Sequence, residues 1–231
     1  MECGRARGRQ LGRRGVVITF VGLAGLAVVY VLALQFTTVE VRQGLAQQTF
    51  YIHAPSAWSA LLSFSLVGFA SAIYLFLKDP RLDRFAASSA EVGVAFSVVM
   101  LTTGPIWGKP IWGTWWTWDA RLTLTLFLFF LFVGYLTLRA AIPDQAERAR
   151  FSAVVGIMGM VLVPFIHLSV YLFRTLHPQP IVLKPSAPSL PPEMLRTLLT
   201  SFGVFTILYL GFVTLRYGIA LAAESHGDDD A

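Results

Sequence analysis

Six long apolar segments, separated by polar turns, dominate the pattern of hydrophobic and polar positions along the chain. Each segment is close to the roughly 20 residues that a helix needs to cross the hydrocarbon core of a bilayer. The alternating segments of about ten residues that are typical of membrane-spanning strands do not occur. The pattern predicts an all-α, polytopic integral membrane protein with six transmembrane helices. The segments are Gly15–Phe36, Trp58–Leu77, Ala86–Gly104, Leu122–Leu138, Phe151–Phe173 and Met194–Ala222.

The composition indicates that lipid, rather than water, surrounds most of the chain. Its 231 residues are 55% hydrophobic and 13% charged, whereas a soluble domain is about 25% charged. The five arginines of the first fourteen residues directly precede an apolar segment. The positive-inside rule explains them better than nucleic-acid binding does, so we expect no nucleic-acid partner. The first apolar segment is longer than that of a signal peptide, and we expect it to be retained as a span.

The distribution of Lys and Arg predicts the orientation in the membrane. With the N-terminus in the cytoplasm, twelve of these residues fall on the inner side and six on the outer side, which favours both termini inside. We therefore expect a basic cytoplasmic tail at 1–14, a membrane domain at 15–222 and an acidic cytoplasmic tail at 223–231. Three long connections then lie on the outer face, at Thr37–Ala57, Pro105–Arg121 and Arg174–Glu193.

The second of these connections, 105–121, contains the run WGKPIWGTWWTWDAR. Tryptophans at a membrane surface commonly anchor helices in the headgroup region. Anchoring does not account for five tryptophans within twelve residues, accompanied by an Asp and two cations. We therefore interpret the run as a platform for a large flat ligand, with anchoring as the alternative. The platform residues are Trp107, Trp112, Trp115, Trp116, Trp118 and Asp119.

Two histidines flank this run from separate connections. His53 precedes the second span, where Pro55 and Ser56 form a helix-start signature, and we expect it about one turn outside the membrane helix. His177 follows the fifth span in RTLHPQP, where the prolines end the helix. Two imidazoles on opposite faces of a porphyrin satisfy both axial positions of haem iron. His53 and His177 are therefore a candidate pair for axial ligation of haem.

A porphyrin also needs partners for its two propionates. Arg suits them best because it pairs bidentately with carboxylates. The candidate cations are Arg121, Lys109, Arg42 and Arg174. Three roles stay open for Asp119: supporting Arg121, accepting a hydrogen bond from a tryptophan N–H, or orienting a histidine.

A third histidine, His167, lies inside the fifth span and competes as a ligand, since ionisable groups at membrane depth are functional candidates. The interpretation that we favour is a core histidine hydrogen-bonded near Ser169 or Tyr171. His226, in the polar C-terminal segment, is expected to be inert.

The chain resembles the haem-handling proteins of cytochrome c maturation, whose tryptophan-rich WWD signature is similar to WGKPIWGTWWTWDARLT here. Within that family, the histidine motifs of the CcmC branch are similar to YIHAPSAW and VPFIHLSVYLFRTLHPQ. The resemblance extends over roughly Gly15 to Tyr217. It departs from the usual pattern near the last histidine, where the family tends to have a Trp-Trp pair and a following Gln. Here Leu172, Phe173 and Pro178 stand instead, which weakens an aromatic contact.

The resemblance implies a multi-pass protein of the bacterial inner membrane that binds haem b non-covalently and transiently. Such proteins present haem on the periplasmic face and promote its loading onto the haem chaperone CcmE. They work with the ABC-type ATPase CcmA, the membrane subunit CcmB and the small single-span protein CcmD. The resemblance makes His53 and His177 the axial ligands and places the tryptophan segment against haem and the chaperone.

On this interpretation the protein is a binding and transfer factor, not an enzyme. One alternative is a haem exporter that moves haem across the membrane. The other is a secondary transporter unrelated to haem, which the scarcity of ionisable groups inside the spans disfavours.

Overall fold

The computed structural model describes residues 2–182 and 184–227, which form helices and loops and no strand. Six helices are long and apolar enough to cross a membrane, which confirms the predicted all-α fold with six spans. In chain order the elements are α1 (Glu2–Val31), the π-helical turn η1 (Leu32–Phe36), the 3-10 helix η2 (Gly44–Thr49), α2 (Phe50–Leu77), α3 (Pro80–Trp112), α4 (Ala120–Ala141), α5 (Gln145–Leu172) and α6 (Pro192–Gly227).

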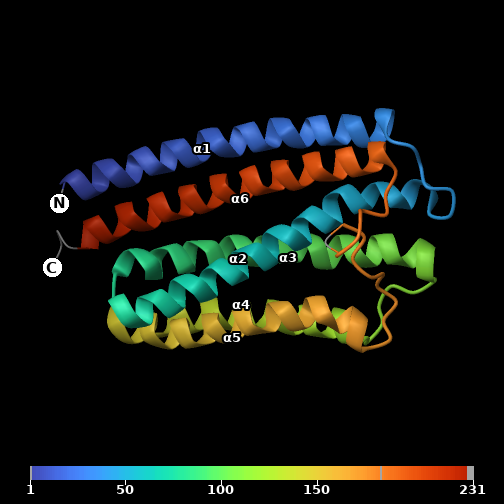
Figure 1. The fold of residues 1–231 in the computed structure, drawn as a ribbon. Coiled ribbons are helices and arrows are strands. Elements are labelled where there is room, and N and C mark those ends of the chain that lie inside the picture. The colour runs from blue at the N-terminus through green and yellow to red at the C-terminus, as the bar shows by residue number, and fades with distance from the viewer. Residues whose placement is uncertain (1, 183, 228–231) are drawn as a thin grey trace.

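The helices run along one long axis, with both ends of the chain at the same end of the bundle (Figure 1). α1 and α6 lie side by side as a pair, and α2 to α5 form the rest of the bundle. The connections that follow α1, α3 and α5 gather at the opposite end. We call this the loop end, and it comprises residues 37–49, 113–119, 173–182 and 184–191.

Glycines allow α1 and α6 to approach closely. A Cβ added at Gly15 would lie 2.4 Å from the backbone nitrogen of Leu215, and one added at Gly8 would lie 2.8 Å from that of Ala222. Small residues of this kind let transmembrane helices pack backbone to backbone. The outward side of α1 is apolar, and Phe20 on it is 67% exposed, as expected for a helix that borders lipid.

The expected terminal tails are in part continuations of this helix pair. The basic residues 2–14 form the start of α1, and α6 continues to Gly227. Asp228–Asp230 and the side chain of His226 lie outside the described residues. The cytoplasmic placement of both termini stays a prediction.

Three aspartates determine where helices begin. The side chain of Asp79 accepts a hydrogen bond from the backbone N–H of Arg81 at the start of α3. Asp119 and Asp144 cap α4 and α5 in the same way. Each carboxylate satisfies a backbone donor that has no partner within the helix.

The predicted start of the second helix was wrong. α2 begins at Phe50, so Pro55 lies inside the helix and His53 lies in its first turn, not one turn outside it. A proline leaves the carbonyl of the residue four positions earlier without its helical donor. Here that carbonyl belongs to Tyr51, and the hydroxyl of Ser201 in α6 donates to it. The tertiary contact therefore compensates the bond that Pro55 removes.

The third helix is longer than its apolar segment indicates. α3 continues through Pro105 and Pro110 to Trp112 and ends at Gly113, whose φ of 74° is a left-handed conformation that glycine adopts readily. The first part of the expected connection 105–121 is therefore helical. This extension carries Trp107 and Trp112 on a rigid element.

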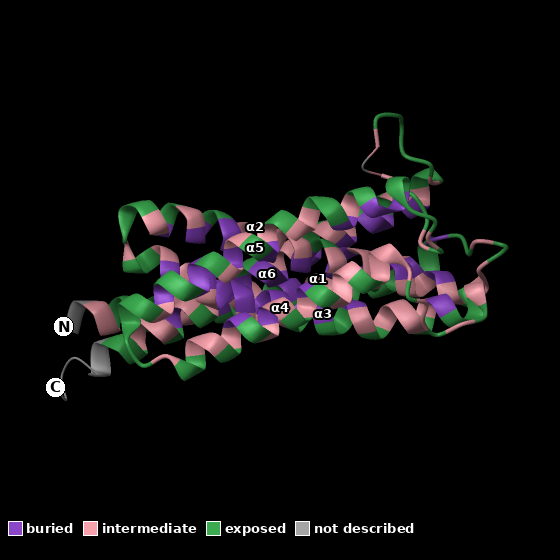
Figure 2. Ribbon diagram, turned by 90° about the horizontal axis from the view of Figure 1, so that it is seen from below, coloured by how far each residue is buried: buried purple, intermediate pink, exposed green. Residues whose placement is uncertain are grey.

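An aromatic layer fills the bundle below the loop end. The rings of Phe64 (α2) and Phe132 (α4) stack with centroids 3.8 Å apart. A Cβ added at Gly159 in α5 would lie 2.4 Å from Phe132, so only glycine fits beside this ring. Figure 2 shows the buried residues concentrated along the middle of the bundle.

Ion pairs connect the helices toward the end that holds the chain termini. The guanidinium of Arg139 (α4) forms two hydrogen bonds, of 2.6 and 2.9 Å, to the carboxylate of Asp83 (α3). Arg84 pairs with Glu224, and a further pair joins Arg216 to Glu91. These bidentate and paired charges fix α3 against α4 and α6.

Candidate functional site

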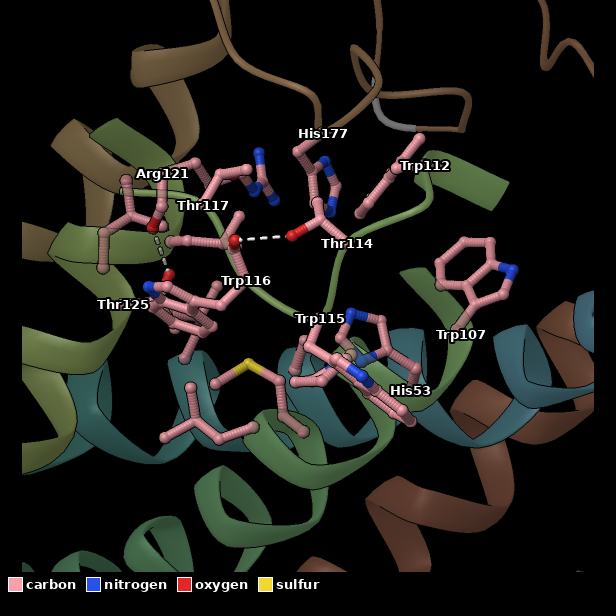
Figure 3. A pocket seen from close by; sticks show the side chains of 18 residues that line it. His53, Trp107, Trp112, Thr114, Trp115, Trp116, Thr117, Arg121, Thr125 and His177 are labelled. Atoms are coloured by element: carbon pink, nitrogen blue, oxygen red, sulfur yellow. Dashed lines mark hydrogen bonds between the residues drawn. The ribbon is translucent and has the colours of Figure 1, made fainter. Parts of the chain in front are cut away.

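A cavity at the loop end brings the predicted ligand-binding residues together (Figure 3). Its floor is apolar and includes Leu61, Met100 and Ile166. An apolar cavity with a few convergent polar groups is the usual form of a small-molecule site. Its aromatic and polar lining consists of His53, Trp107, Trp112, Thr114, Trp115, Trp116, Thr117, Arg121, Thr125 and His177.

His53 enters the cavity from the first turn of α2, and a hydroxyl on α3 fixes its tautomer. Its Nδ1 lies 3.2 Å from Oγ1 of Thr103. The single hydroxyl hydrogen of Thr103 is donated to the carbonyl of Val99 at 2.7 Å, so Thr103 accepts from His53 Nδ1–H. The hydrogen bonds therefore assign the lone pair of His53 to Nε2, the nitrogen left free for a metal.

His177 enters from the connection between α5 and α6 and has the same tautomer. Its Nδ1 lies 2.9 Å from the carbonyl oxygen of Pro178, which can only accept. Burial, together with the nearby Arg121, lowers the pKa of His177 to about 4. The imidazole is thus neutral at pH 7, the form that coordinates metals.

The two histidines reach the cavity from different elements, and in Figure 3 the ring of His177 lies above that of His53. Among the described residues, no group of three or more His, Cys, Asp or Glu side chains could hold a metal ion. A pair of imidazoles suits a metal that already carries other ligands, as haem iron carries its porphyrin.

Four of the five platform tryptophans line the cavity. The indole N–H of Trp107 donates to Oε1 of Gln43 at 3.0 Å, and its ring lies 5.6 Å from that of His53. Trp118 lies outside the lining and is 76% exposed. Its ring contacts Trp116 edge to face at a centroid distance of 5.8 Å.

Of the four candidate cations, Arg121 is the one placed in the cavity wall. Arg42 and Arg174 are exposed and lie outside the lining. Lys109 donates to the carbonyl of Gly113 at 2.9 Å and lies over the ring of Trp115. The side chain of Lys109 therefore caps the C-terminus of α3.

Two donors in the cavity wall are buried without a hydrogen-bond partner among the described residues. They are Nη1 of Arg121 and Nε1 of Trp116. Leaving a buried donor unpaired costs about 1–3 kcal/mol, and more for a charged group. A ligand that offers acceptor oxygens would satisfy them.

Asp119 lies beside the cavity, and its hydrogen bonds come from two backbone N–H groups and one hydroxyl rather than from Arg121 or an indole. It accepts from the N–H of Leu122 at 3.0 Å and from the hydroxyl of Thr117 at 3.2 Å. It also accepts from the N–H of Leu176 at 3.3 Å, next to His177.

His167 is half-buried on α5 and does not line the cavity. Its ring lies 6.4 Å from that of Tyr171. Among the described residues the imidazole of His167 has no hydrogen bond, and the hydroxyl of Ser169 donates to the carbonyl of Ile166 at 2.8 Å.

Sequence reasoning missed the residues that support the site. Thr103 holds His53, and Gln43 holds Trp107. Gly104 leaves room for the imidazole, since a Cβ there would lie 3.2 Å from Cε1 of His53. In the sequence, the glycine at position 104 is the one sign that another side chain packs closely there.

The fold and the site define a multi-pass membrane protein with two histidines and a tryptophan-rich wall around one cavity. The chain belongs to the CcmC family, described as heme exporter protein C, whose family profile matches residues 9–228.

Curated relatives agree with this assignment. The chain is 34% identical over 216 residues to heme exporter protein C of Haemophilus influenzae, covering 94% of this chain and 88% of the relative. It is 36% identical over 152 residues to heme exporter protein C of Escherichia coli K12, covering 66% and 62%. A ccmC-like mitochondrial protein of Marchantia polymorpha, named for cytochrome c biosynthesis, is 34% identical over 169 residues, covering 73% and 71%.

Proposed function

We propose that the protein binds haem b at the loop end and delivers it for cytochrome c biogenesis. The observation that carries the proposal is the pair formed by His53 and His177. Both have Nδ1 engaged in a hydrogen bond, and both line one cavity with Nε2 free. The names of the relatives support haem as the cargo.

The cavity wall offers what the rest of a haem molecule needs. The tryptophans supply flat apolar surface for the macrocycle. The unpaired donors on Arg121 and Trp116 suit a propionate carboxylate. We infer that Arg121, rather than Lys109, Arg42 or Arg174, is the principal propionate partner.

The proposed setting is the bacterial inner membrane, with the loop end in the periplasm and both chain ends in the cytoplasm. The exposed rings of Trp115 and Trp118 would meet the haem chaperone CcmE, which receives the haem. CcmA, CcmB and CcmD would be the partners within the membrane complex. The protein would act by binding and release, without a chemical step of its own.

Optical spectroscopy of the purified protein titrated with haemin tests the ligand assignment. We expect a six-coordinate, low-spin spectrum that the double substitution His53→Ala, His177→Ala abolishes. The His167→Ala variant is the matched control and should keep the spectrum. An unchanged spectrum in the double variant would overturn the assignment.

Delivery and orientation need separate measurements. Mixing the haem-loaded protein with purified CcmE should transfer haem to the chaperone. In a Cys3→Ser background, a cysteine introduced at Val41 should react with a membrane-impermeant reagent from the periplasm. A cysteine at Ile142 should not, and the reverse labelling would place the loop end in the cytoplasm.

The alternative is a subunit that carries haem across the membrane. The stacked rings of Phe64 and Phe132 fill the bundle below the cavity, which favours delivery from one face over passage through this chain. Haem flux into liposomes that contain this protein alone would favour the alternative.

A further inference from the structure

One carboxylate joins the tryptophan-bearing connection to the connection that carries His177. Both oxygens of Asp119 are engaged. Oδ1 accepts from the N–H of Leu122 and caps α4, while Oδ2 accepts from the hydroxyl of Thr117 and from the N–H of Leu176. A helix cap needs only the first of these bonds. The bond to Leu176 spans 57 positions of the chain and is a tertiary contact.

The segment around His177 has few other attachments. The hydroxyl of Thr175 donates to the carbonyl of His177, and the imidazole donates to the carbonyl of Pro178. Both bonds are local and move with the segment. Among the hydrogen bonds of the described residues, Leu176 N–H to Asp119 is the one that attaches residues 174–178 to another part of the fold.

The hydrogen bond to Asp119 therefore constrains the backbone next to His177. The bond fixes the backbone one residue before His177, while Pro178 limits the backbone directly after it. Without the bond, the segment between the end of α5 and Pro178 could turn the imidazole away from the cavity.

We propose that Asp119 is a positioning residue that holds His177 in the cavity through the backbone N–H of Leu176. The proposal rests on the proposed function in taking His177 as a haem ligand. This role differs from that of the tryptophan platform. The carboxylate of Asp119 bonds to the backbone of the connection that carries His177 and does not contact haem.

Asp119→Asn is the test variant, because Asn still caps a helix but has one acceptor oxygen where Asp has two. We expect haemin to bind about 10- to 100-fold more weakly, as is typical when a partner of a metal ligand is lost. The spectrum should match that of His177→Gly, and added imidazole should restore the six-coordinate form in both variants. Asp144→Asn, which makes the same change at the cap of α5 and outside the cavity lining, should keep the wild-type spectrum.

Imidazole rescue separates positioning from direct contact. If Asp119 touched the haem or served only as a cap, imidazole would not restore the spectrum of Asp119→Asn, and the proposal would be overturned. A wild-type spectrum in Asp119→Asn without added imidazole would overturn it as well.

Amide hydrogen exchange of the haem-free protein tests the contact independently of haem. The amide of Leu176 should exchange faster in Asp119→Asn than in the wild type and in Asp144→Asn. Equal exchange rates would refute the attachment. Failure of the wild type to bind haemin would instead refute the proposed function while leaving this result valid.

Discussion

The imidazole of His53 donates its Nδ1 hydrogen to the hydroxyl of Thr103, 3.2 Å away on the neighbouring helix α3. Thr103 can accept this bond because its own hydrogen is donated to the carbonyl of Val99. The pair determines which nitrogen of His53 faces the cavity.

Replacing Thr103 should therefore weaken haem binding without removing a ligand. In Thr103→Val the acceptor for Nδ1 is lost, and we expect haemin affinity to fall by about 10- to 100-fold. The measurement is a haemin titration followed by absorbance. Thr102→Val is the matched control, because Thr102 makes the same bond to its own helix but is exposed; an equal loss in both variants would contradict the assigned tautomer.

Replacing Arg121 should weaken haem binding only through the loss of its hydrogen bond to a haem propionate. In Arg121→Gln a charge-assisted hydrogen bond of about 1.5–3 kcal/mol is lost, which corresponds to roughly 10- to 150-fold weaker binding. The dimethyl ester of haem, which has no free carboxylate, should bind the variant and the wild type alike.

Arg174→Gln is the control for this comparison, since Arg174 is exposed and outside the cavity lining. If Arg121→Gln weakened the ester as much as haem, the arginine would act on the wall of the cavity and not on a propionate.

The bond from Ser201 to the carbonyl of Tyr51 should contribute measurably to stability. In Ser201→Ala a buried carbonyl loses its partner, at a cost of about 1–3 kcal/mol. Thermal unfolding in detergent measures the change. Thr200→Ala, which removes an exposed hydroxyl that bonds within its own helix, should have little effect.

A second substitution tests the reason for this bond. Pro55→Ala supplies the missing helical N–H, so it should recover most of the stability lost in Ser201→Ala. If the two substitutions were simply additive, the carbonyl freed by Pro55 would not be what Ser201 satisfies.

Alanine should destabilise the contact between α1 and α6 at Gly15 but not at Gly12. A Cβ at Gly15 would lie 2.4 Å from the backbone of Leu215, whereas a Cβ at Gly12 meets nothing within 4 Å. Gly15→Ala should therefore lower the unfolding temperature. Gly12→Ala should leave it unchanged or raise it, because alanine favours helix by up to about 1 kcal/mol.

The hydrophobic pattern was sufficient to predict the fold class and the number of spans. A bilayer requires about 20 apolar residues for each helix, and this requirement is local to each segment. Helical residues outside the hydrocarbon core need not be apolar. The hydrophobic pattern therefore placed the start of α2 and the end of α3 incorrectly. α2 begins at Phe50, and Ser201, 150 positions from Tyr51, satisfies the Tyr51 carbonyl that Pro55 leaves free.

The sequence by itself determined the chemistry of the candidate site: two histidines, a dense run of tryptophans and several cations near one membrane surface. Only the tertiary structure separated Arg121 from Arg42, Arg174 and Lys109, because burial in a cavity wall depends on how four helices meet. The same holds for the partners of the histidines. Thr103 contacts His53 across 50 positions of the chain, and Asp119 contacts Leu176, the neighbour of His177, across 57. Contacts at such separations leave no periodic pattern in the sequence.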